Sequence, residues 1–359
     1  MAKKILVVDD SALIRKQLGE LFDQAGYDVG LAKHGQEALE FLAQVDFDVI
    51  TMDINMPVMD GLTAVKEIMR QKPTPIVMVS SLTQDEAEIT FEALDLGAVD
   101  YVAKPGTITL DLERQQQDIL DKVAMAAQIP SSRLAIRQKA RRKKVALQKQ
   151  STTAKAGSAS AHAQETIPEK WVLVGASTGG PGLIEEIVTS LPADYPYPVC
   201  VVQHMPDNFT AVFAQRLAKK SQVQVVEARM GEKLTPAKVI IAKGGKHLHF
   251  AKKASGMVSA KLMPNTEQRF FCPSVDEMFF SAAKVLTPAA NILAVELTGI
   301  GDDGADGMVA LREKGAYTLA ESEQTAVVYG MPKEAWLRGG AMKQLPFPDI
   351  VQEILDFGR

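Results

Sequence analysis

The chain of 359 residues is poor in cysteine, has little net charge and lacks a long apolar run. Its two cysteines, Cys200 and Cys272, lie in or beside apolar stretches, which favours reduced thiols over a disulfide scaffold. No apolar run approaches the roughly 18 residues of a membrane span. Asp9 and Asp10 follow the amino terminus too closely for a secretory signal. A net charge of -4 gives no sign of a polyanion partner. We therefore expect a cytoplasmic protein that is not inserted in a membrane.

The length predicts two domains, each large enough for its own core. In the first half, short apolar runs alternate with segments of helical spacing. The expected strands are Ile5–Val8, Val29–Ala32, Val49–Met52, Ile76–Val79 and Tyr101–Ala103. The expected helices are Leu13–Ala25, Gln36–Ala43, Leu62–Arg70 and Glu86–Leu96. This repeat predicts a parallel sheet covered on both faces, with its chemistry outside the carboxyl ends of the strands.

Polar side chains fall at that edge of the expected sheet. They are Asp9, Asp10, Asp53, Ser80 and Lys104. Three crowded carboxylates stay ionised only if a cation joins them, and oxygen ligands of this kind suit Mg²⁺. A hydroxyl and a lysine directed at the same point suit a phosphoryl group. One acid at a strand end is usually a turn or helix cap, but five suitable residues at successive strand ends favour a phosphoryl site.

Residues 5 to about 123 resemble a response-regulator receiver domain, which has a flavodoxin-like (βα)5 fold. The matching motifs are V-V-D-D-S at Val7–Ser11, M-D-I-N-M-P-V-M-D-G at Met52–Gly61, V-S-S at Val79–Ser81 and A-K-P-G at Ala103–Gly106. The resemblance implies that Asp53 accepts a phosphoryl group from the sensor histidine kinase of a chemosensory array. It implies a Mg²⁺ site made by Asp9, Asp10, Asp53 and the backbone carbonyl of Asn55. It also implies that Ser80, where the family often has threonine, and Lys104 sense the acyl phosphate.

A connector is expected after a helix at Leu110–Ile129. Arg133–Lys149 is strongly basic and contains no acid, and Ser151–Gln164 is rich in Ala, Ser and Thr. No aromatic residue lies in this stretch to stack on a base, and the next domain has no helix-turn-helix pattern. We therefore expect a flexible charged tether, helical in its basic part, and no nucleic-acid partner.

The second half opens with a strand–turn–helix pattern. The apolar run Trp171–Val174 leads into Gly-x-Ser-x-Gly, with Ser177 at its centre, and a helix is expected after Pro181, at Leu183–Ile187. This is the context of a nucleophile elbow, in which glycines allow a tight turn and the serine is presented at the sheet edge. The alternative is a plain glycine turn that holds a serine by chance.

Further elements continue an α/β pattern. They are strands at Val199–Val202, Val223–Val226, Lys246–Ala251 and Ile292–Leu297, and helices at Asn208–Lys219 and through Lys314. A serine needs a base to take its proton, and a carboxylate can hold an imidazole base in the right tautomer. Among five histidines, His204 is favoured because it ends a buried strand. Asp302, Asp303 and Asp306 all qualify as the acid by type, and their spacing does not choose between them.

Residues from about 170 to 359 resemble the catalytic domain of the chemotaxis protein-glutamate methylesterase, a doubly wound, mainly parallel-sheet domain. The order Ser…His…Asp differs from the Ser…Asp…His order of α/β-hydrolases. The matching motifs are G-A-S-T-G-G-P, Q-H-M-P, P-S-V-D at Pro273–Asp276, L-T-G-I-G-D-D-G-A-D-G-M and G-M-P-K-E-A at Gly330–Ala335. The resemblance implies that Ser177 is the nucleophile, His204 the general base and acid, and Asp303 the orienting carboxylate. Oxyanion candidates are the backbone amides of Thr178 and Ile300.

The expected domains are therefore a receiver at 1–125, a linker at 126–169 and a methylesterase at 170–359. The implied activity is demethylation of glutamate γ-methyl esters on chemoreceptors, and deamidation of receptor glutamines, with no cofactor for ester hydrolysis. The resemblance also implies that the unphosphorylated receiver covers the catalytic cleft. Two positions depart from the family pattern: Ile300 replaces a usual methionine, and Phe271-Cys272 stands where the family tends to have histidine and arginine.

Two other function classes remain. The chain could be a phosphorylation-driven interaction protein, although no member of the serine–histidine–acid set is missing. It could instead bind a nucleotide at Gly175–Gly182, but that segment lacks the lysine of G-x-x-x-x-G-K-[ST] and the spaced G-x-G-x-x-G pattern.

Overall fold

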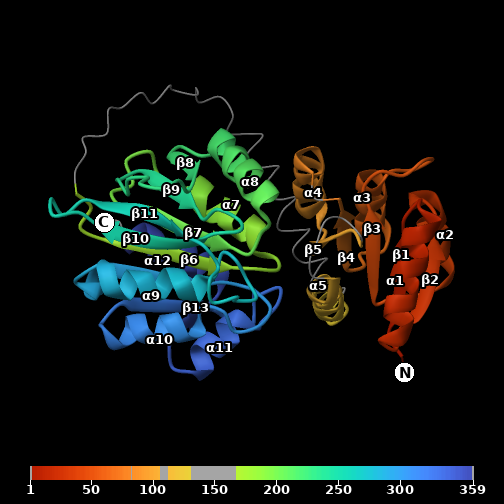
Figure 1. The fold of residues 1–359 in the computed structure, drawn as a ribbon. Helices are drawn as coiled ribbons and strands as arrows, with labels where there is room; N and C mark the ends of the chain where they lie inside the picture. The colour runs from red at the N-terminus through yellow and green to blue at the C-terminus, as the bar shows by residue number, and fades with distance from the viewer. Residues whose placement is uncertain (1, 82, 106–111, 131–166, 358–359) are drawn as a thin grey trace. The chain divides into compact units, whose positions relative to one another are not determined.

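The computed structural model describes residues 2–81, 83–105, 112–130 and 167–357. It divides into two compact units, Met1–Ser158 and Ala159–Arg359, which are described separately. Figure 1 shows a parallel sheet with flanking helices in each unit. The basic stretch and the Ala/Ser/Thr-rich stretch of the expected tether lie outside the described residues. In the described ranges, no helix combines the length and apolar character needed to cross a membrane.

The first unit alternates strands and helices. Its elements are β1 Lys4–Val8, α1 Ala12–Gln24, β2 Asp28–Ala32, α2 Gly35–Gln44, β3 Val49–Asp53, α3 Gly61–Gln71, β4 Ile76–Ser80, α4 Gln84–Leu96, β5 Asp100–Ala103 and α5 Leu112–Ala126. The five strands form one parallel sheet in the order β2-β1-β3-β4-β5, which confirms the predicted fold. The strand order reverses between β1 and β3, and a ligand site is expected at the carboxyl ends of these two strands.

The second unit is larger. Its elements are β6 Trp171–Ala176, α7 Gly180–Ser190, β7 Val199–Gln203, α8 Asp207–Lys220, β8 Gln224–Glu227, β9 Lys238–Ile241, β10 His247–Lys252, β11 Val258–Met263, α9 Val275–Val285, a 3-10 turn Ala289–Asn291, β12 Ile292–Glu296, α10 Ala305–Glu313, β13 Tyr317–Glu321, α11 Met331–Leu337, β14 Lys343–Leu345 and α12 Phe347–Phe357. Seven strands form a parallel sheet in the order β14-β13-β12-β6-β7-β9-β8. Strands β10 and β11 form a separate antiparallel pair.

Strand β6 is central in this sheet. It pairs with β7 on one side and with β12 on the other, so the segments that follow these three strands emerge at one edge. All three strands are buried along their whole length, because both faces of the sheet are covered. Their burial explains the continuous apolar runs in the sequence, and their adjacency brings distant parts of the chain together.

The turn after β6 is tighter than the sequence pattern predicts. Helix α7 begins at Gly180, three residues before the expected Leu183. Gly179 has a φ of 79°, in the left-handed region that favours glycine, and Pro181 in the first helical turn has a φ suited to a helix start. The chain therefore turns from strand to helix within the three residues Ser177–Gly179.

Candidate active site and phosphoacceptor site

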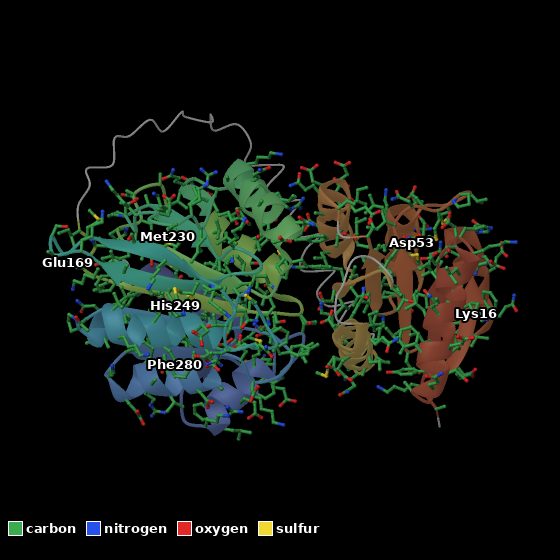
Figure 2. The ribbon with its side chains drawn as sticks, in the orientation of Figure 1. Lys16, Asp53, Glu169, Met230, His249 and Phe280 are labelled. Carbon is green, nitrogen blue, oxygen red and sulfur yellow. The ribbon has the colours of Figure 1, made fainter. Side chains whose placement is uncertain are left out.

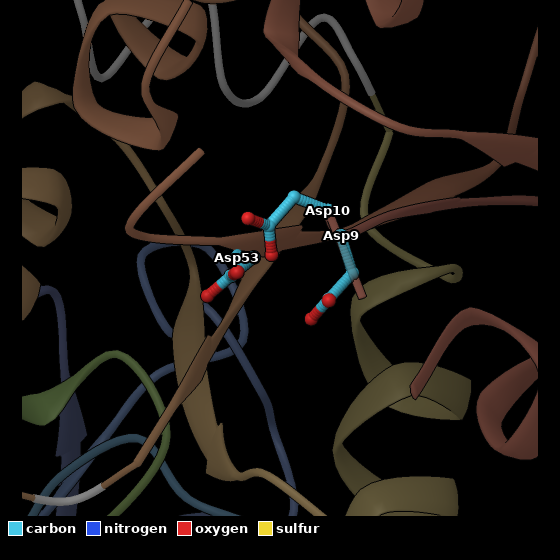
Figure 3. A group of neighbouring side chains, drawn as sticks. All are labelled: Asp9, Asp10 and Asp53. Atoms are coloured by element: carbon cyan, nitrogen blue, oxygen red, sulfur yellow. The ribbon is translucent and has the colours of Figure 1, made fainter. Parts of the chain in front are cut away.

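Three aspartates of the first unit gather at the carboxyl ends of β1 and β3 (Figure 3). Asp9, Asp10 and Asp53 each offer an oxygen within 4.8 Å of the others, and Asp9 and Asp53 are only 1% exposed. The Lys104 ammonium lies 2.8 Å from Asp53 Oδ1 and 3.6 Å from Asp9 Oδ2. Ser80 ends the next strand, β4, and its hydroxyl donates to Glu86 Oε2 at 2.9 Å. The structure thus places the predicted phosphoryl-site side chains at one sheet edge.

Burial sets the electrostatics of this cluster. Desolvation raises the pKa of Asp53 to about 6, against the opposing effect of Lys104, and it also raises the pKa of Asp9. One oxygen of each carboxylate, Oδ2 in both, is buried with no hydrogen-bond partner. Buried carboxylate oxygens with few hydrogen-bond donors around them suit a hard divalent cation. Asn55, just beyond β3, is exposed and donates from its amide to Glu86 at 3.2 Å.

Ser177 and His204 follow directly after neighbouring strands of the second unit. The register pairs Ala176 of β6 with Gln203 of β7, and each candidate is the next residue along its strand. The backbone amide of His204 donates to the carbonyl of Ala176 at 3.1 Å, while the Ser177 amide donates to Thr298 beyond β12 at 2.9 Å. Ser177 and His204 therefore occupy neighbouring positions at the carboxyl edge of the sheet.

The imidazole of His204 is joined to Asp303, which lies in the loop between β12 and α10. His204 Nε2 is 2.7 Å from Asp303 Oδ2, so the ring carries its proton on Nε2 and donates it to the carboxylate. His204 Nδ1 is buried and has no hydrogen-bond partner, and the Ser177 hydroxyl is not bonded to it. The structure thus brings two of the three predicted residues into direct contact and leaves an acceptor nitrogen at the edge where the third stands.

Asp303 is held at the amino terminus of α9. Its Oδ1 accepts from the Ser274 hydroxyl at 2.7 Å and from the Asp276 amide at 3.2 Å, and its Oδ2 accepts from the Val275 amide at 2.7 Å. Burial alone would raise the pKa of Asp303, but the hydrogen bonds from His204, Ser274 and Val275 outweigh it and lower that pKa. The helix amino terminus, with its partial positive charge, favours the ionised carboxylate.

A second carboxylate, that of Asp276, connects the same two helices in the opposite direction. Asp276, in the first turn of α9, accepts from the amide of Gly307 in the first turn of α10 at 2.7 Å. Burial raises the pKa of Asp276 to about 6, and the bond from Gly307 opposes this rise. The two helices therefore exchange caps: an acid just before α10 satisfies α9, and an acid of α9 satisfies α10.

The geometry distinguishes between the three aspartates that the sequence offers as partners of the histidine. The carboxylates of Asp302 and Asp306 are 61% and 60% exposed, and both pair with the Arg338 guanidinium. Only Asp303 contacts an imidazole that ends a sheet strand. Among the other histidines of this unit, His247 accepts from the Ser274 amide at 3.2 Å, and His249 (Figure 2) pairs with Glu277 rather than with the site.

Both oxyanion candidates lie in segments that touch Ser177. Thr178 is the next residue and is buried, and its carbonyl accepts from the Thr298 hydroxyl at 2.9 Å. Ile300 follows Gly299, where a Cβ would lie only 2.8 Å from the Cβ of Ser177. A side chain at position 299 would therefore push the loop that carries Ile300 away from the serine.

Sequence reasoning missed three features of this site. The first is the role of Ser274 and the α9 amides, since α9 itself is not predicted. The second is the aromatic ring of Phe271, which lies parallel to the His204 imidazole. The third is Glu296 at the end of β12, which is fully buried and has no hydrogen-bond partner on either oxygen. A glutamate inside an apolar strand pattern was the one signal that could have revealed the third.

Comparison with known proteins places these observations in a family. Residues 172–354 match the family described as CheB methylesterase, and residues 5–112 match the response regulator receiver domain. The chain belongs to the CheB methylesterase family. A protein-glutamate methylesterase/protein-glutamine glutaminase of Carboxydothermus hydrogenoformans is 46% identical over 99% of both chains, and one from Archaeoglobus fulgidus is 41% identical over 99% of this chain and 97% of that one.

A solved structure supports the same assignment for the second unit. The CheB methylesterase catalytic domain of Thermotoga maritima is 37% identical, with a TM-score of 0.50, and the match covers 52% of this chain and 97% of that one. The prediction of a CheB-type protein-glutamate methylesterase/glutaminase with an amino-terminal receiver domain is therefore confirmed. The acidic cluster of Asp9, Asp10 and Asp53 lies in that receiver and is consistent with a Mg²⁺-dependent phosphorylation site.

Proposed function

We propose that the second unit hydrolyses glutamate γ-methyl esters on chemoreceptors, with Ser177 as nucleophile, His204 as general base and acid, and Asp303 as orienting carboxylate. The observation that carries this assignment is the 2.7 Å bond between His204 Nε2 and Asp303, which leaves a buried, unpartnered Nδ1 on the residue beside Ser177. A neutral imidazole with one nitrogen fixed by a carboxylate and the other open is suited to take a serine proton.

The chemistry is acyl transfer in two steps. Ser177 Oγ attacks the ester carbonyl carbon while His204 Nδ1 takes the hydroxyl proton, and that proton then passes to the departing methoxide, which leaves as methanol. Water attacks the resulting acyl-enzyme by the same route and releases the glutamate side chain and the serine. A glutamine side chain reacts in the same way, with ammonia as the leaving group. No cofactor is needed in this sequence.

The approach of Nδ1 to Oγ requires a movement of Ser177 or His204, because the hydroxyl is not bonded to the ring in this structure. Such contacts commonly tighten only when substrate binds. The backbone amides of Thr178 and Ile300 are proposed to stabilise the oxyanion, and one such donor is typically worth roughly 3 kcal/mol. Their segments flank the serine on both sides, as the close approach of Gly299 to Ser177 indicates.

For the first unit, we propose that Asp53 accepts a phosphoryl group from a sensor histidine kinase of a chemosensory array. Asp9, Asp10, Asp53 and the carbonyl of Asn55 would hold Mg²⁺, and the buried carboxylate oxygens that accept no hydrogen bond, Oδ2 of Asp9 and of Asp53, fit that ion. When bound, Mg²⁺ would neutralise charge on the carboxylates and on the incoming phosphoryl oxygens. Ser80 and Lys104 are proposed to sense the acyl phosphate, and Lys104 already contacts Asp53.

Phosphorylation is proposed to relieve inhibition of the esterase. The proposed domains are the receiver at residues 1–125, the linker at 126–169 and the catalytic domain at 170–359. A near-complete switch between inhibited and active arrangements needs about 5.5 kcal/mol of differential stability. A protein of residues 170–359 should then outpace the unphosphorylated full chain in methanol release, and equal rates would remove inhibition from the proposal.

The nucleophile is tested by replacing Ser177 with alanine in the full chain. We expect this variant to lose methanol release from methylated receptors and to lose covalent labelling by a fluorophosphonate. The matched control is Ser190→Ala at the far end of α7, where the serine hydroxyl donates to the Glu186 carbonyl. Retained labelling in Ser177→Ala would instead favour another nucleophile, and unlabelled wild-type protein would favour an interaction or nucleotide-binding role.

A further inference from the structure

The face of the His204 imidazole is covered by an aromatic ring. The Phe271 ring and the imidazole have centroids 3.9 Å apart and planes only 10° from parallel. Phe270 meets Phe271 edge-on at 4.8 Å and is itself 50% exposed. Asp303 restrains an edge of the imidazole, whereas Phe271 restrains its plane. Rotation of the ring out of this plane would drive it into Phe271.

The segment that carries Phe271 is anchored on the same unit. The carbonyl of the next residue, Cys272, accepts from the Gly245 amide at 3.0 Å, and the Ser274 amide donates to His247 Nδ1 at 3.2 Å. Ser274 also donates to the carboxylate that holds His204, as described above. One short segment therefore carries both the ring that stacks on the base and the hydroxyl that holds the acid.

Resting on the function proposed above, we infer that Phe271 is a positioning residue for the general base. It holds the imidazole in the plane in which Nε2 meets Asp303, and it favours the cation that forms when the serine proton arrives. The face of an aromatic ring carries partial negative charge, which attracts a cation placed over it. The neutral imidazole gains less from this attraction, so Phe271 stabilises mainly the transition state in which His204 becomes protonated.

The first test replaces Phe271 with leucine, which removes the flat ring, and with tyrosine, which keeps it. In the full chain, with methylated receptors in membranes as substrate, we expect Phe271→Leu to lower kcat about ten-fold with little change in KM. Phe271→Tyr should retain most of the wild-type kcat. Phe270→Leu is the matched control, because the ring contact found for Phe270 among the described residues is with Phe271, and it should stay within about two-fold of wild type.

A second test leaves the shape of the ring intact. Fluorinated phenylalanines introduced at position 271 withdraw charge from the ring face in steps, and kcat should fall with each added fluorine. A wild-type kcat in Phe271→Leu, or a kcat that does not respond to fluorination, would overturn the inference. Ser177→Ala, assayed in parallel, distinguishes a failure of the proposed function from a failure of this inference. If Ser177→Ala still releases methanol, the proposed function fails. If Ser177→Ala is inactive and Phe271→Leu is fully active, only the role of Phe271 is refuted.

Discussion

Glu296 offers a quantitative test of how the site is built. Its carboxyl lies beneath the catalytic loops, where a Cβ at Gly175 would be 2.8 Å from Glu296 Oε1 and a Cβ at Gly304 would collide with Oε2. Burial raises the pKa of Glu296 well above its ordinary value of 4.5, and the nearby charges of Asp303 and Asp276 raise it further. We therefore expect folded Glu296 to keep its proton at pH values above 4.5, where an exposed glutamate has lost it.

The sign of the pH dependence follows from proton binding. Between 4.5 and the folded pKa of Glu296, the unfolded chain has released a proton that the folded chain retains, so stability falls as pH rises. The loss is about 1.4 kcal/mol per pH unit in that window. Glu296→Gln has no proton to release, so the difference between its free energy of unfolding and that of wild type should grow in favour of the variant by about 1.4 kcal/mol for each pH unit above 4.5, up to the folded pKa of Glu296.

Tryptophan fluorescence during urea unfolding gives the measurement, because Trp171 and Trp336 are the two tryptophans of the chain and both lie in the second unit. Glu313→Gln, at an exposed position on α10, is the control and should keep the wild-type pH dependence. If the gap between Glu296→Gln and wild type does not widen with pH, the carboxyl is ionised in the folded state and the reasoning is refuted.

Three further predictions concern the two sites. Asp303→Asn should lower the rate of methanol release by about 10³–10⁴-fold, whereas Asp302→Asn, which alters an exposed ion pair, should change it less than about two-fold; similar losses in both would contradict the assignment of the acid. Ser274→Ala should cost about 1 kcal/mol of unfolding free energy and reduce kcat, with rescue by Ser274→Thr, and an unchanged kcat would show that the backbone amides hold Asp303 by themselves. Chelation of divalent cations should abolish phosphorylation of Asp53 by a small-molecule phosphodonor, and added Mg²⁺ should restore it; phosphorylation that persists in the chelator would exclude a cation requirement.

Much of the architecture could be predicted from the sequence. Apolar runs such as Ile5–Val8 and Trp171–Val174 identify strands that are buried on both faces, and the polar residues after them identify the reactive edge of each sheet. Ser177, His204 and the aspartate cluster were found in this way. Each of these residues lies at or just beyond the end of a strand, so its position in the sequence indicates at which edge of the sheet it stands.

The remaining details depend on pairings between distant segments. Nothing in the spacing of Asp302, Asp303 and Asp306 shows which one meets His204, because the choice is made by the amino terminus of α9, which comes earlier in the chain. The stack of Phe271 on His204 depends likewise on how the segment before α9 lies over the sheet edge. Helix α7 starts early because the left-handed Gly179 allows an immediate turn, a conformation that the apolar periodicity does not report.

The exchange of caps between α9 and α10 has a consequence for how this enzyme can fail. Asp303 and Asp276 each accept from backbone amides of the neighbouring helix, and on α9 this contact adds to the local cap that Ser274 makes with the Glu277 amide. A change that separates the two helices would therefore release Asp303, the proposed orienting acid, and at the same time remove acceptors from the amides at both helix starts. Partially unfolded molecules should therefore have no esterase activity, and they should not hydrolyse other esters.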